Sequence, residues 1–62
     1  MKIPSHYKPT LTFRHGETWY KIVLNKDIYF LYRQESENDY TQIGTGNNPQ
    51  KLEYRVYDGK LK

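Results

Sequence analysis

Cysteine is absent from the 62 residues, which excludes a disulfide framework and a thiolate metal site. Small secreted domains commonly depend on disulfides, so we expect this chain in a reducing environment. No apolar stretch is long enough to cross a bilayer or to form the apolar part of a signal peptide. The sequence therefore predicts a soluble, cytoplasmic protein without a membrane partner.

Helical periodicity and catalytic groupings are also lacking. No window sustains apolar residues at helical spacing. The only serines, Ser5 and Ser36, fall in segments that we predict to be flexible, and the only histidines, His6 and His15, do not have the spacing of metal ligands. We therefore expect no catalytic residue, no metal site, no cofactor and no enzymatic activity.

One short string nevertheless has the form of a catalytic motif. Residues 13–18, Phe-Arg-His-Gly-Glu-Thr, contain Arg-His-Gly-Glu, which resembles the signature of the histidine phosphatase family. The resemblance implies a phosphorylated histidine at His15. That chemistry needs a second histidine and further arginines from a much longer α/β domain, whereas this chain has only His6 besides. We interpret the string as a turn around Gly16 and do not assign the nucleophile role to His15.

Aromatic residues are what the chain has in excess. One tryptophan, seven tyrosines and two phenylalanines occur in 62 residues, whereas disordered chains contain few aromatics. The net charge of +3 is compatible with nucleic acid but is too small to indicate it. A chain of this length forms one domain and buries only about 60% of its surface, so the core must be thin.

The order of strand and turn signals predicts an all-β protein. Residues 1–9 contain Pro4 and Pro9 without a periodic pattern, which indicates an extended N-terminal arm, and residues 10–62 are expected to form a single small β domain. We expect an antiparallel sheet of four or five strands, in an SH3-like barrel or a curled meander. The strand candidates alternate or are rich in β-branched and aromatic residues: 10–13, 18–24, 28–33, 40–43 and 52–57.

Turn lengths assign these side chains to two faces of the sheet. A two-residue turn at His15-Gly16 and a three-residue turn at residues 25–27 give registers that agree with each other. One face then forms the core, with Leu11, Phe13, Tyr20, Ile22, Leu24, Ile28, Phe30 and Tyr32. The other face carries Thr10, Thr12, Arg14, Trp19, Lys21, Val23, Tyr29, Leu31 and Arg33.

The second face is the predicted binding site. Large apolar side chains alternate there with basic ones. Either the arm, the last strand or the curvature of a barrel covers them, or they form an exposed binding surface; the sequence leaves both open. For the second case we take Trp19 and Tyr29 as anchors and Lys21 and Arg33 as orienting charges. The complete set of candidate binding residues is Arg14, Trp19, Lys21, Tyr29, Leu31 and Arg33.

The function expected from this surface is contact with a macromolecule. We expect a non-enzymatic adaptor or inhibitor that docks on a protein partner through the aromatic and basic face or an unpaired strand edge. One alternative is a nucleic-acid-binding domain, single-stranded or duplex, in which bases stack on the rings and cations meet phosphates. Another is a structural subunit of a larger assembly, including a homo-oligomer.

Overall fold

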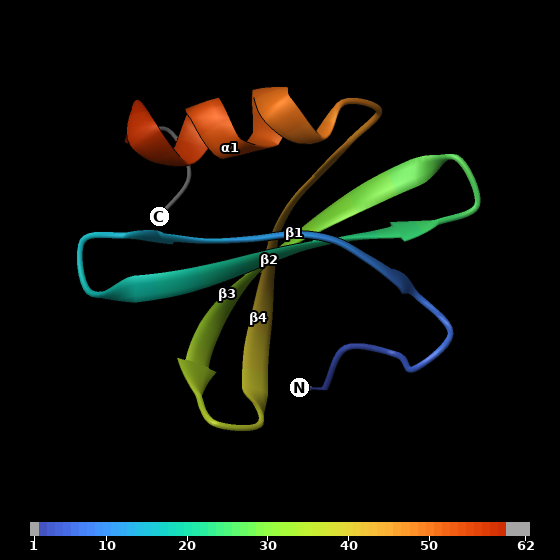
Figure 1. The fold of residues 1–62 in the computed structure, drawn as a ribbon, viewed down its shortest axis with the longest axis horizontal. Coiled ribbons are helices and arrows are strands. Elements are labelled where there is room, and N and C mark those ends of the chain that lie inside the picture. Colours follow the sequence, from blue (N-terminus) through green and yellow to red (C-terminus); the bar gives the residue numbers. More distant parts are fainter. Residues whose placement is uncertain (1, 60–62) are drawn as a thin grey trace.

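Four antiparallel strands and one helix make up the computed structural model, which describes residues 2–59. The strands pair in the order of the chain within one open sheet (Figure 1). The expectation of a small, mainly β domain is confirmed, and the C-terminal helix is an addition to it. The elements are β1 (Lys8–His15), β2 (Thr18–Asn25), β3 (Ile28–Ser36), β4 (Asp39–Gly46) and α1 (Pro49–Tyr57).

The first hairpin turns at Gly16 and Glu17, one residue later than expected. His15 pairs with Thr18 and Phe13 with Tyr20. Gly16 has a φ of 65°, a left-handed conformation that favours glycine. Relative to the prediction the pairing moves by two residues, and two is the period of side-chain direction along a strand. The predicted faces of β1 and β2 are therefore confirmed although the predicted register is wrong.

The second hairpin corrects the prediction for β3. Its turn has two residues, Lys26 and Asp27, because Asn25 pairs with Ile28; Lys26 takes the left-handed conformation with a φ of 58°. A shift of one residue moves every side chain of a strand to the opposite face. The predicted faces of β3 are therefore wrong for all six positions: Tyr29, Leu31 and Arg33 share a face with Ile22, and Ile28, Phe30 and Tyr32 lie on the other.

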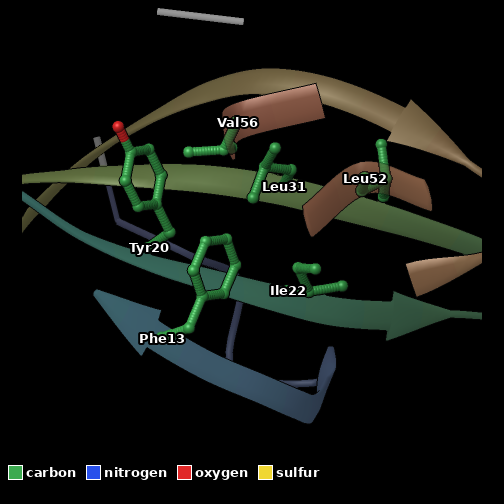
Figure 2. Close-up of a cluster of buried hydrophobic side chains, with 6 residues drawn as sticks. All are labelled: Phe13, Tyr20, Ile22, Leu31, Leu52 and Val56. Carbon is green, nitrogen blue, oxygen red and sulfur yellow. The ribbon is translucent and has the colours of Figure 1, made fainter. Parts of the chain in front are cut away.

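The face of the sheet under α1 holds the main core, and we call it the core face. Strands β1, β2 and β3 contribute side chains from below, and two helical residues four positions apart close the cluster from above (Figure 2). Each side chain of this size contributes about 1.5–3 kcal/mol when it is fully buried. The cluster consists of Phe13, Tyr20, Ile22, Leu31, Leu52 and Val56.

The helix replaces the last strand that the sequence predicted. The Asn48 side chain caps its first turn: Asn48 Oδ1 accepts hydrogen bonds from the backbone N–H groups of Gln50 at 2.9 Å and Lys51 at 3.3 Å. Pro49 follows at the start of the helix, where its missing N–H costs no hydrogen bond. Strand alternation would place Tyr54 beside Leu52, but Tyr54 points away from the sheet and is 64% exposed.

The pair Asp58-Gly59, which resembles a hairpin turn in sequence, ends this helix instead. The Asp58 N–H donates to the Tyr54 carbonyl at 2.8 Å, and the Gly59 N–H donates to the Val56 carbonyl at 3.1 Å. Gly59 has a φ of 74°. A left-handed glycine with these bonds satisfies carbonyl groups that the last helical turn leaves without a partner.

The segment between the strand candidates 28–33 and 40–43 is mostly strand. Strand β3 continues to Ser36 and β4 begins at Asp39, so only residues 37 and 38 form the turn. A bulge follows, because Gln42 pairs with Tyr32 and Gly44 with the adjacent Leu31. The extra residue, Ile43, packs against the core cluster. The bulge thus adds one apolar side chain to the core.

The N-terminal arm, residues 2–7, covers part of the opposite face, which we call the arm face. Figure 1 shows α1 and the arm on opposite sides of the strands. The Tyr7 ring packs edge-on against Phe30, with 5.1 Å between the ring centroids. Val23 and Tyr32 on this face are also buried. The sequence left open whether the arm covers this face or leaves it exposed. Around Phe30 the arm does cover it.

Candidate functional site

The register divides the six candidate binding residues between the two faces. Leu31 is 0% exposed and belongs to the core cluster, so its predicted place on an exposed surface is wrong. Tyr29 is half-buried and packs against the same cluster. The reason for both corrections is the one-residue shift at the β2–β3 turn.

Arg33 also moves to the core face, at its margin. Its Nε atom lies 2.5 Å from Oε1 of Glu35, two residues further along the same strand. Both side chains are partly exposed, at 31% and 39%. This ion pair lies near the end of β3, where a register shift between Gln34 and Ser36 interrupts the alternation, and Glu35 lines a hollow that also borders Trp19.

Arg14 and Trp19 share the arm face as predicted, and the two-residue change of register makes them direct neighbours, which was not predicted. They are directly paired across β1 and β2, and opposed side chains of an antiparallel pair lie within contact distance. The Arg14 guanidinium carbon is 5.8 Å from the centroid of the Trp19 ring, a cation–π distance. Trp19 nevertheless stays 47% exposed. The strands thus hold a large aromatic ring at the surface in one orientation.

A shallow hollow of about 210 Å³ adjoins the Trp19 ring. The carboxylates of Glu17 and Glu35 border the hollow. Arg14 lies over the Trp19 ring, and Arg33 pairs with Glu35. The four charges cancel formally. We call this area the Trp19 surface; it comprises Arg14, Arg33 and the residues that line the hollow, namely Glu17, Trp19, Gln34, Glu35 and Ser36.

Lys21 forms the second cation–aromatic pair of the arm face. Its ammonium group is 5.4 Å from the centroid of the Tyr40 ring. Lys21 lies on β2 and Tyr40 on β4, the two strands that flank β3. Lys21 pairs with Tyr32 of β3, and Tyr40 pairs with Gln34 of the same strand. The sequence interpretation made 40–43 a strand candidate but assigned it to no face, so Tyr40 was not among the candidate residues. The spacing of two between Tyr40 and Gln42, which puts both side chains on one face of a strand, is the signal that could have found it.

Exposed aromatic residues also occur on α1, outside the predicted site. Tyr54 and Tyr57 lie 6.3 Å apart between ring centroids, and His15 contacts Tyr57 at 5.3 Å. The Tyr57 hydroxyl donates to Glu53 at 2.5 Å, and this hydrogen bond raises the pKa of Tyr57 above its usual value. Among residues 2–59, no lysine or arginine side chain lies over the Tyr54 ring. This residue therefore serves as a comparison for Trp19.

A metal-ion cluster and a membrane-spanning helix are both absent from residues 2–59. Within that range no group of three histidine, aspartate or glutamate side chains is placed to hold a metal ion. The single helix described there is too short to cross a membrane. Comparisons of the chain with protein-family models, with curated proteins and with solved structures find no match.

Proposed function

We propose that this chain is a non-enzymatic protein-binding module, an adaptor or inhibitor, that docks a protein partner on the Trp19 surface. The observation that carries the proposal is a tryptophan 47% exposed and oriented by Arg14 on a rigid strand pair. Tryptophan and arginine dominate the energetic centres of protein interfaces. A ring already held in place also loses little conformational entropy on binding.

The charges around the ring favour a protein over nucleic acid. Phosphate binding depends on a surplus of cations along the contact, and the Trp19 surface has a formal balance of arginines and glutamates. A base stacked on Trp19 would bring its phosphates close to Glu17 and Glu35. A protein segment with an apolar side chain for the ring and a basic one for these carboxylates is complementary to the surface.

The free edge of β4 supports the alternative of a structural subunit. Among the described strands β4 pairs only with β3, and it contains neither lysine nor proline, residues that usually block pairing at edges. Both edge strands contain a bulge, at Ile43 in β4 and after Pro9 in β1, but only β1 carries a proline. A second copy of the chain could therefore pair along β4. Light scattering over a range of concentrations separates the two proposals, because the docking module is expected to be a monomer.

Two variants that each remove one exposed aromatic ring test the docking proposal. Wild type, Trp19→Ala and Tyr54→Ala are immobilised and exposed to extract of the source cells at low and high salt, and retained proteins are quantified by mass spectrometry. We expect a protein that binds wild type and Tyr54→Ala. Trp19→Ala should bind it about 30-fold more weakly, the equivalent of a 2 kcal/mol interface residue.

Two results would contradict the proposal. One is that every retained protein binds Trp19→Ala as strongly as Tyr54→Ala. The other comes from amide chemical-shift titrations with single-stranded and duplex oligonucleotides: shifts at Arg14 and Trp19 that are strong at low salt and lost at high salt would favour the nucleic-acid alternative.

A further inference from the structure

A second hollow, separate from the Trp19 surface, lies between the arm and the arm face. Its volume is about 380 Å³, within the range of about 300–1,000 Å³ that is typical of small-molecule sites. Three segments distant in sequence form its walls: the arm, the middle of the sheet and the β3–β4 turn. The lining residues that matter here are Lys2, Pro4, Tyr7, Lys21, Asn38 and Tyr40.

The arm is fixed where it borders this pocket. The Tyr7 backbone N–H donates to the Pro4 carbonyl at 3.1 Å, which closes a turn of the arm. The Tyr7 ring packs on Phe30 of β3. Proline restricts the backbone at two positions of the wall, Pro4 and Pro9. Contacts within the chain therefore hold the arm against the sheet at Tyr7, where it borders the pocket.

The charge of the lining is of one sign. Lys2 and Lys21 contribute ammonium groups, and none of the described residues that line the pocket is aspartate or glutamate. Asp39 lies between two lining residues, Asn38 and Tyr40, but strand alternation places it on the opposite face from Tyr40. A Lys21 ammonium held 5.4 Å from the Tyr40 centroid is already oriented for an anion near that ring.

We propose that this pocket binds a small organic anion, with its acidic group between Lys2 and Lys21 and its apolar body against the rings of Tyr7 and Tyr40. Two cations without an acidic neighbour in the lining select negative charge. The aromatic and proline walls select an apolar body of limited size, and Asn38 offers an amide for hydrogen bonding. The inference goes beyond the proposed docking function and does not depend on it.

Amide chemical-shift titrations of the full chain test this proposal. Benzoate and phenyl phosphate serve as anionic probes, benzamide as the neutral control, and inorganic phosphate as the anion without an apolar body. We expect benzoate or phenyl phosphate, or both, to give saturable shifts at Tyr7, Lys21 and Asn38. The comparison of the two identifies the preferred acidic group. Benzamide lacks the charge and inorganic phosphate lacks the apolar body. Each is expected to bind at least about tenfold more weakly, because benzamide loses a charged hydrogen bond and inorganic phosphate loses the burial of the ring.

Matched lysine substitutions locate the site. Lys21→Gln and Lys2→Gln should each weaken the anionic probe about tenfold, whereas Lys51→Gln removes the same charge from α1, outside the pocket lining, and should not. Trp19→Ala should leave the probe affinity unchanged. Failure of the docking proposal can therefore be distinguished from failure of the anion-binding proposal. The inference is overturned if neither anionic probe saturates, if benzamide binds equally well, or if Lys51→Gln weakens binding as much as both pocket variants.

Discussion

The register of β3 determines which aliphatic side chains hold the domain together, and two alanine substitutions in that strand test it. Leu31 is 0% exposed and Ile28 is 49% exposed, although the sequence interpretation assigned them the reverse roles. Leu31→Ala removes a side chain from the core cluster, which costs about 2–5 kcal/mol. Ile28→Ala removes a half-exposed side chain at the strand end and should cost less than about 1 kcal/mol.

These losses are large relative to the whole domain. A 62-residue protein has a free energy of unfolding of about 3–9 kcal/mol, and each lost kcal/mol lowers the melting temperature of such a domain by about 4–8 °C. Urea and thermal unfolding, followed by circular dichroism, measure both variants. If Leu31→Ala unfolds completely, Ile22→Val provides a milder test of the same cluster, at about 0.5–1.5 kcal/mol. An Ile28→Ala variant as unstable as Leu31→Ala would refute the register.

Two further predictions concern the helix cap and alkaline pH. Asn48→Ala should lower the free energy of unfolding by about 1 kcal/mol, measured by thermal unfolding, because the backbone N–H groups of Gln50 and Lys51 lose their acceptor. Asn48→Asp should keep most of the wild-type stability. Equal stability of all three proteins would contradict the cap. Burial raises the pKa of Tyr32 above its usual value of 10.0, and Tyr7 raises it further. The native state therefore retains the Tyr32 proton at a pH where the unfolded state has lost it, so stability is lost as pH rises above about 10. Tyr32→Phe should reduce this loss in urea unfolding at alkaline pH, and an unchanged pH dependence would contradict it.

The alternation of polar and apolar residues made the strands predictable, and it also predicted which side chains of β1 and β2 share a face. Phe13, Tyr20 and Ile22 show the period of two that a half-buried strand requires, and the same alternation placed Arg14 and Trp19 on one face, although it did not predict that they pair directly. The position of β3 was not predictable in this way. Its turn uses Lys26 in a left-handed conformation, where glycine or asparagine is the usual signal. Without that signal, turns of two and three residues both fit the sequence.

The helix was missed because its apolar residues fit two periods. Leu52 and Val56 are four positions apart, which matches one helical face and also one strand face when Tyr54 lies between them. The cap was the informative signal: Asn48 followed directly by Pro49 is typical of a helix start. The pocket under the arm was not predictable, since it requires Tyr7 to pack on Phe30 and Lys2 to line the same hollow as Lys21. These contacts join segments distant in sequence and carry no local pattern.

The most direct test of the docking account uses Trp19 itself, because it is the only tryptophan of the chain and its fluorescence reports on one site. The measurement is acrylamide quenching and emission wavelength of the domain, alone and saturated with a tryptophan-free segment of the captured partner. We expect emission to move to shorter wavelength and quenching to fall on binding, in wild type and in Tyr54→Ala alike. A partner that saturates the domain while Trp19 keeps the emission and quenching of the free protein would contradict the account.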